Sequence, residues 1–271
     1  MPFDLLQALS DTSTHVQLFG RTLPQFISPA FFMLVAIGFF AQLVDGAMGM
    51  AYGLTSSSLL LFFGVPPQAV SASVHAAEIA TTGVSGISHS YFGNVDAKLV
   101  WKLAIPGVLG GVVGALLLSR VSNEWLKPVV AVYLLGLGTL LLKRAWHWQP
   151  SIVAKKTGPS LGLVAGFLDA VGGGGWGTMT TGSLLAKSHE PRIAIGSANA
   201  AEFFVTVAIS AVLFATFGLA HLQLIAGLIL GGVLAAPLAA SLTKLVPARV
   251  AMTAIGSLVI LLSVLNLGKG L

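Results

Sequence analysis

Four acidic residues lie deep in apolar sequence, in a chain that otherwise keeps charge out of such stretches. They are Asp45, Glu78, Asp169 and Glu202, while the other five of the nine acids fall in the N-terminal tail or in predicted loops. A charge at the centre of a bilayer costs at least about 2.5–3.5 kcal/mol, so acids in such positions indicate function. Because no Lys or Arg lies at a matching depth, these carboxyls are predicted to carry protons, bind a coupling ion or accept hydrogen bonds.

Polar residues around Glu78 recur at steps of four and three, which places them on one helix face. They are Ser71, His75, Glu78, Thr82, Ser85 and His89, and the second half of the chain keeps Asn199, Glu202 and Thr206. Two such faces turned toward each other would line a water-accessible path, with His75 as a proton partner or anion donor. The alternative is that these groups hydrogen-bond between helices and only fix their packing.

Glycine-rich stretches follow the two aspartates: "VDGAMGMAYG" at 44–53 and "LDAVGGGGWG" at 168–177. Glycine after the aspartate lets the backbone leave helical geometry, so a new helix can begin inside the membrane with free N–H groups that attract an anion. The predicted anion-binding residues are Gly49, Gly53, Thr55, Ser56, Ser57, His75, Gly173, Gly174, Gly175, Thr178, Thr180 and Asn199. In the alternative interpretation, Asp45 and Asp169 cap these helices and the glycines allow close packing.

Other chemistries find little support in the sequence. The run Gly172–Gly175 is not a nucleotide-binding loop, because no Lys-Ser/Thr pair follows it and no strand precedes it. The chain has no cysteine, which excludes disulfides, iron–sulfur clusters and thiol catalysis. Since there is also no tight ligand cluster and no nucleophile–base pair, we expect no metal, no cofactor and no enzymatic activity.

The composition is that of a membrane protein. Of 271 residues, 55% are hydrophobic and 8% are charged, against about 25% charged in soluble domains. Apolar runs of spanning length recur, so the predicted fold is an all-α integral membrane bundle rather than a barrel. The net charge of +5 comes from basic residues between apolar segments. They fit topology signals better than nucleic-acid binding.

An internal repeat organises the chain. A shift of 124 positions aligns Asp45 with Asp169 and Glu78 with Glu202 without a gap. Each half is predicted to contain two short segments, 30–45 and 47–63 in the first half, that form a broken-helix hairpin, followed by three full spans. The total is eight to ten membrane segments. The predicted parts are an N-terminal tail over 1–28 that can form an interfacial helix, repeat one over 29–145, a linker over 146–156 and repeat two over 157–271.

The basic residues bear on the orientation of these halves. If each hairpin returns to its own side, the two halves are inverted and the Lys and Arg residues divide ten against four. If each hairpin makes one crossing, giving eight spans, they divide eight against six. The positive-inside rule favours two inverted repeats with both termini outside, and eight spans is the alternative.

Four stretches resemble the TauE/SafE sulfite exporter family, also called the 4-toluenesulfonate uptake permease family. They read "AQLVDGAMGMAYG", "FGVPPQAVSASVHAAEIATTGVSGISH", "AGFLDAVGGGGWGTMTTGSLL" and "HEPRIAIGSANAAEFFVTVAIS", and the resemblance covers nearly everything from Phe31 onward. It implies transport of sulfite, sulfonates or related organosulfur anions across the bacterial cytoplasmic membrane. The first half reads "GAMGMAYG" where the second has a fuller glycine run, which argues against equal roles for the halves.

These observations together predict a secondary transporter of a small organosulfur anion, in which Glu78 and Glu202 exchange protons. A cation or metal-ion permease that uses the four carboxyls is the first alternative, and a membrane-embedded enzyme or a scaffold subunit is the second. The oligomeric state stays open. A face of small residues can pack helices within or between chains, and it consists of Gly107, Gly110, Gly111 and Gly114.

Overall fold

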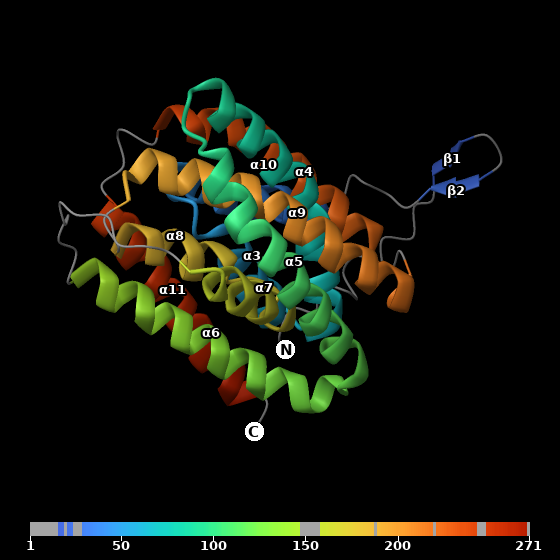
Figure 1. Ribbon diagram of the computed structural model, residues 1–271. Coiled ribbons are helices and arrows are strands. Elements are labelled where there is room, and N and C mark those ends of the chain that lie inside the picture. Colours follow the sequence, from blue (N-terminus) through green and yellow to red (C-terminus); the bar gives the residue numbers. More distant parts are fainter. Residues whose placement is uncertain are drawn as a thin grey trace.

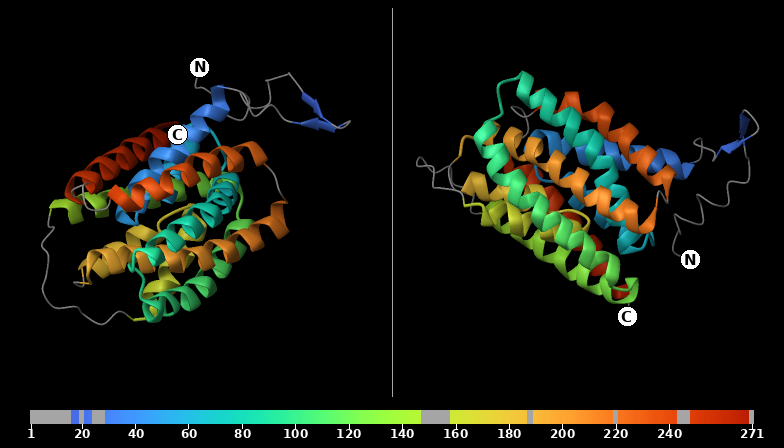
Figure 2. Two further views of the ribbon diagram at one scale, coloured as in Figure 1. Left: turned by 90° about the horizontal axis from the view of Figure 1, so that it is seen from above. Right: turned by 45° about the vertical axis from the view of Figure 1, so that its right-hand side comes forward.

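The computed structural model of the chain describes residues 16–18, 21–23, 29–146, 158–186, 189–218, 221–242 and 248–269. These residues are almost entirely helical, as the hydropathy predicts (Figure 1). The predicted interfacial helix, and the linker after Trp146, lie outside the described residues. The tail adds two short antiparallel strands that the sequence did not predict, β1 (Val16–Leu18) and β2 (Arg21–Leu23). Figure 2 shows this hairpin lying apart from the helices.

Within the described ranges, each half of the chain contributes five helices. Those of the first half are α2 (Pro29–Met48), α3 (Tyr52–Phe62), α4 (Pro67–Tyr91), α5 (Ala97–Arg120) and α6 (Asn123–Trp146). Those of the second half are α7 (Ser160–Gly172), α8 (Trp176–Ala186), α9 (Pro191–Phe217), α10 (Leu222–Leu242) and α11 (Ala248–Lys269). Local signals start several of them. Proline is the first residue of α4 and of α9, a position where a backbone N–H would have no partner within the helix. The Asp96 carboxylate caps α5 by accepting from Lys98 N at 2.9 Å.

Within the described ranges, six helices are long and apolar enough to cross a membrane: α2, α5, α6, α9, α10 and α11. Helix α4 has 25 residues, but its polar stripe lowers its hydropathy. The prediction that both opening segments are too short to span is wrong for α2, which has 20 residues, and holds for α3, which has 11. A multi-pass membrane protein is therefore confirmed, and the total of eight to ten segments stays a prediction.

The first helix of each half packs mainly along a helix of the other half. Helix α2 packs along α10 of the other half, and α7 packs in the same way along α5. Glycines permit both approaches, because a Cβ on Gly46 would meet Ala239 and a Cβ on Gly114 would lie 3.0 Å from Ala170. Helices α6 and α11 lie side by side along one edge, and α3, α7 and α8 lie between this pair and the group α4, α9 and α10 (Figure 1).

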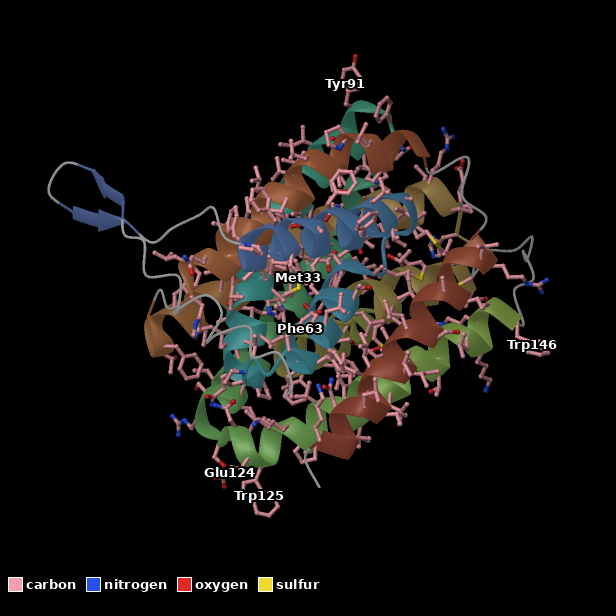
Figure 3. All side chains as sticks on the ribbon, turned by 180° about the vertical axis from the view of Figure 1, so that it is seen from behind. Met33, Phe63, Tyr91, Glu124, Trp125 and Trp146 are labelled. Atoms are coloured by element: carbon pink, nitrogen blue, oxygen red, sulfur yellow. The ribbon has the colours of Figure 1, made fainter. Side chains whose placement is uncertain are left out.

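Two pairs of corresponding helices, α6 with α11 and α4 with α9, run in opposite directions. The end of α6 meets the beginning of α11, where Arg249 Nε donates to the Ala145 carbonyl at 2.9 Å. The residues after α4 likewise meet the beginning of α9, where Asp96 N donates to Ser197 Oγ at 2.9 Å. Figure 3 shows Glu124 and Trp125 at one end of the bundle, away from Tyr91 and Trp146.

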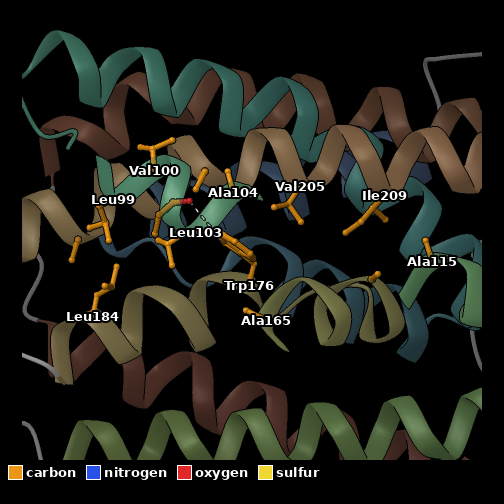
Figure 4. Close-up of a cluster of buried hydrophobic side chains, with 14 of the residues drawn as sticks. Leu99, Val100, Leu103, Ala104, Ala115, Ala165, Trp176, Leu184, Val205 and Ile209 are labelled. Atoms are coloured by element: carbon orange, nitrogen blue, oxygen red, sulfur yellow. Dashed lines mark hydrogen bonds between the residues drawn. The ribbon is translucent and has the colours of Figure 1, made fainter. Parts of the chain in front are cut away.

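The largest hydrophobic cluster fills the space between α5, α7, α8 and α9 and surrounds a completely buried tryptophan, Trp176. Figure 4 shows this side chain among Leu103, Ala165 and Val205. Its indole Nε1 donates to the Ala198 carbonyl at 3.0 Å, so the one polar atom of the ring is satisfied.

The small-residue face of α5 is used inside the chain. Gly107 lies under the Trp176 ring, Gly111 lies against Ile209, and Gly110 and Gly114 lie against the backbone of α7. These four glycines therefore pack helices of one molecule, and they give no support to an interface between chains.

Candidate functional site

The first glycine-rich turn separates α2 from α3, and its position differs from the predicted one. Helix α2 continues past Asp45 to Met48, and the chain leaves helical geometry only at Gly49, which has a φ of 66°. The Asp45 carboxylate then reaches across the turn: Oδ1 accepts from Ala51 N at 2.7 Å and from Tyr52 N at 3.1 Å. Asp45 thus caps the helix that follows, although it lies in the last turn of the helix before.

The second turn repeats this arrangement 124 positions later. Helix α7 ends at Gly172, Gly173 has a φ of 71°, and Asp169 Oδ1 accepts from Trp176 N at 2.9 Å. The capping interpretation therefore describes both aspartates. The N–H groups of Ala51, Tyr52 and Trp176 already donate to these carboxylates, so an anion at either helix N-terminus would need other donors, such as the next N–H groups of the same helix or side chains.

The two turns touch each other at the centre of the molecule. A Cβ on Gly53 would lie 2.8 Å from Gly174 Cα, and a Cβ on the equivalent Gly177 would lie 2.5 Å from Met50 Cα. Thr178 Oγ1 adds a hydrogen bond to the Met50 carbonyl at 3.3 Å. The structure thus brings together the predicted glycines of both halves, as a contact between two breaks in helices.

The second turn is held by donors from α3, α4 and α6. Ser57 Oγ donates to the Gly173 carbonyl, Ser71 Oγ donates to the Ala170 carbonyl at 2.8 Å, and Tyr133 OH donates to the Gly174 carbonyl at 3.0 Å. All of these donors belong to the first half of the chain, whereas the turn belongs to the second. The halves are therefore joined by polar contacts at their centre.

His75 of α4 also contacts the second turn, where it shares a proton with the side chain of Asp169. Its Nδ1 lies 2.7 Å from the Ser71 carbonyl, which only accepts, so Nδ1 carries a proton. Its Nε2 lies 3.1 Å from Asp169 Oδ2. Either the imidazole is charged and donates to an ionised Asp169, or a protonated Asp169 donates to the imidazole. In both cases one proton lies between these two buried groups.

Several other buried oxygens have no hydrogen-bond partner among the described residues, although such groups are usually satisfied in native structures. They are both carboxyl oxygens of Glu78, Oε2 of Glu202, Oδ2 of Asp45, Oδ1 of Asn199 and the hydroxyls of Ser56, Ser73, Thr81 and Thr181. Glu78 is 1% exposed and Glu202 is 5% exposed. An ionised carboxylate in this setting lacks compensation, so each glutamate needs a proton, a cation or a ligand donor.

Three other predicted residues are not among the side chains with unbonded, buried oxygens. Thr180 Oγ1 donates to the Trp176 carbonyl one turn back along α8, so its hydroxyl is already bonded. Thr55 is only half-buried, unlike Ser56 and Ser57. Gly175 lies against the Tyr133 ring. These three residues support the turns or lie beside them, and the unbonded oxygens belong to other side chains.

Three groups could hold a cation between them. His75, Glu78 and Asp169 each offer a ligand atom, and these atoms lie within 4.8 Å of one another. The sequence predicted no metal site because it does not show this clustering of α4 with α7. Since His75 and Asp169 already bond to each other, Glu78 alone of the three has unused oxygens.

Sequence reasoning missed four polar residues at the turns: Gln42, Tyr133, Arg144 and Thr181. Thr181 could have been found, because it lies 124 positions after Ser57. Arg144, assigned to a loop by its position near a segment end, reaches the Thr178 carbonyl and Ser183 Oγ on α8. Gln42 is completely buried, and neither atom of its amide has a partner in the described part of the chain. No sequence signal distinguishes Gln42 or Tyr133.

Comparison with known proteins agrees with this architecture. A family model described as "Sulfite exporter TauE/SafE" matches residues 34–267. The chain is also similar to a protein of Bacillus subtilis (strain 168) named "Probable membrane transporter protein YtnM", with 41% identity over 237 residues, 84% of this chain and 79% of the relative. No solved structure matches.

Proposed function

The chain belongs to the TauE/SafE sulfite exporter family and is a membrane transporter, and from this premise we propose that it moves a small organosulfur anion, sulfite or a sulfonate, with linked movement of protons. The observation that carries the proposal is the group of unbonded, buried oxygens around two touching helix breaks. Few buried polar groups in native proteins lack a hydrogen-bond partner, so these oxygens indicate a place for a ligand. Transporters built from inverted repeats bind their substrates at broken helices.

The proposed anion site uses neutral donors. The N–H groups of Ala51, Tyr52 and Trp176 already donate to Asp45 and Asp169, so hydroxyls and protonated carboxyls would supply much of the hydrogen bonding to the oxyanion. Ser56 and Thr181 have buried hydroxyls without a partner in the described ranges, and that of Thr181 lies beside Gly49. A protonated Glu78 or Glu202 can donate to the oxyanion, whereas an ionised one repels it. Binding of the anion would therefore be linked to binding of protons.

The geometry also supports two inverted repeats in a bacterial cytoplasmic membrane. Helices α6 and α11 run in opposite directions, and so do α4 and α9, as an odd number of reversals between the halves requires. The ends of α4 and α6 then lie on the side predicted to carry ten of the fourteen basic residues. From the positive-inside rule we propose that this side is cytoplasmic and that both termini are outside.

Purified protein reconstituted into liposomes tests the substrate. We expect uptake of radiolabelled sulfite or of a small sulfonate to exceed that of protein-free liposomes, and we expect an imposed proton gradient to change the rate. Sulfate and a carboxylate of similar size serve as comparison anions. Failure of every sulfur oxyanion to enter, with the protein shown to be folded by gel filtration, would contradict the proposal.

Replacing Glu78 or Glu202 by glutamine tests the proton link. Glutamine keeps the size of the side chain but cannot exchange a proton, so we expect transport to lose its dependence on pH in both variants. Uptake measured from mildly acidic to mildly alkaline pH checks this. Glu124→Gln, which changes an exposed acid at the start of α6, is the control and should keep the pH profile of the unaltered protein. A normal profile in both glutamine variants would rule out the proton role.

The alternative is a cation or metal-ion permease, which the short distances among His75, Glu78 and Asp169 favour. Such a transporter would bind divalent metal ions in the absence of any anion. Titration calorimetry with sulfite in one series and zinc or manganese in the other separates the two functions, because only one class of ligand should give saturable heat.

A further inference from the structure

The two central turns occupy equivalent surroundings that differ in chemistry. Gly173 of the second turn lies against Ser57 of α3, and Gly49 of the first turn lies against Thr181 of α8, the position equivalent to Ser57. His75 of α4 faces the second turn, and its equivalent, Asn199 of α9, faces the first. Each turn is thus contacted by a hydroxyl group and by one larger polar side chain from the other half.

Hydrogen bonding distinguishes these surroundings. At the second turn, Ser57 donates to the Gly173 carbonyl, and His75 occupies Asp169 Oδ2. At the first turn the equivalent oxygens have no partner among the described residues: Asp45 Oδ2, Thr181 Oγ1 and Asn199 Oδ1. Asp45 is 3% exposed, and the other two side chains are completely buried. The first turn therefore presents three buried and unsatisfied oxygens.

Two of these oxygens, those of Thr181 and Asn199, lie beside Gly49 together with the Ile195 Cγ2 methyl, and the Asp45 carbonyl accepts from Gly49 N in the same turn. An atom at the position of its missing Cβ would lie 3.1 Å from Thr181 Oγ1 and 3.2 Å from Asn199 Oδ1. The Asn199 amide is oriented by its other atom, because Nδ2 donates to Ser85 Oγ at 2.9 Å. This bond turns Oδ1, an acceptor, toward the turn.

We infer that the first turn binds a hard monovalent cation, sodium, between Asp45, Thr181 and Asn199. All three side chains offer oxygen, the ligand atom of hard cations. Asp45 is the one carboxyl among them, and two N–H groups donate to its other oxygen, so its single charge, when ionised by exchange of its proton for the cation, balances a monovalent ion. Calcium usually takes six to eight oxygens, several of them from carboxylates, which this turn does not provide.

The inference rests on the proposed function in one respect, because the bound cation would offset the charge of the transported anion. Helix C-terminal ends and unwound carbonyls coordinate sodium in other transporters built from broken helices. Only the first turn has the open pattern, so one sodium ion per chain is expected rather than two. Glu78 and Glu202 are not part of this site.

Sodium binding is measured on the purified full chain without any anion substrate. We expect one radiolabelled sodium ion per chain, and a melting temperature raised by sodium chloride but not by potassium or choline chloride at equal ionic strength. Asn199→His introduces the residue of the closed turn, and Thr181→Val removes a hydroxyl with little change of shape. Each should raise the dissociation constant for sodium by about 10–100-fold, the range known for losing a supporting partner of a metal site. Thr139→Val, an exposed threonine of α6, is the matched control and should leave binding unchanged.

Other outcomes would overturn the inference. They are no saturable sodium binding by folded protein, equal stabilisation by potassium or calcium, or unchanged affinity in both Asn199→His and Thr181→Val. Liposome uptake of sulfite is measured separately. Sodium binding without anion transport would remove the proposed function and keep the cation site, whereas sodium-independent transport without sodium binding would do the reverse.

Discussion

Gly177→Ala is expected to abolish transport and to lower the melting temperature by several degrees. The new methyl group would lie 2.5 Å from Met50 Cα and also against the Gly49 carbonyl, so it meets backbone atoms that cannot rotate away. Overpacking of this kind costs about 1–3 kcal/mol, and it would force apart the two turns that form the proposed site. A thermal scan and uptake into liposomes measure the two effects.

Gly136→Ala is the control for this substitution. Gly136 lies in α6, and nothing lies within 4 Å of the position of its Cβ. Alanine is favoured over glycine in a helix interior by about 1 kcal/mol, so this variant should be neutral or slightly more stable. Equal behaviour of the two alanine variants would show that the turns are not in the close contact described.

Much of the fold follows from hydropathy and from the repeat. Apolar runs predict the long helices because lipid requires every spanning backbone group to be bonded within the segment. The position of the first break could not be predicted, because Gly46 looks like a helix breaker after Asp45. In the structure Gly46 stays helical and lets α2 approach Ala239 of α10. The sequence does not reveal which role a glycine plays when the partner lies almost 200 residues away.

The four carboxyls of the candidate site could be predicted from the sequence, but their hydrogen bonds could not. Charge alone singles out Glu78, Glu202, Asp45 and Asp169, since buried acids are costly. The pairing of His75 with Asp169 joins residues 94 positions apart in different halves, and no local pattern encodes it. The fuller glycine run of the second half did suggest unequal halves. The structure explains how they differ, through one bonded and one unbonded aspartate oxygen.

This difference predicts that two aspartates with equivalent positions have unequal effects on stability. Asp45→Ala removes a helix cap from Ala51 and Tyr52, and losing a cap costs about 0.5–2 kcal/mol. Asp169→Ala removes the cap of α8 and also leaves His75 buried without its carboxylate. Breaking a buried pair by removing one partner costs about 3–5 kcal/mol, so Asp169→Ala is expected to be the more destabilising by a factor of two or more.

Denaturation midpoints in sodium-free buffer provide the comparison, since sodium would add its own stabilisation through Asp45 in the unaltered protein. Asp96→Ala, which removes an exposed cap from α5, sets the scale for a simple cap and should cost about 1 kcal/mol. If the His75–Asp169 contact is responsible, the double variant His75→Ala/Asp169→Ala should lose less than the sum of the two single variants, with a coupling of about 0.5–3 kcal/mol. Additive losses, or equal costs for Asp45→Ala and Asp169→Ala, would contradict this explanation of the difference in stability. Each aspartate would then act only as the cap of the helix that follows it.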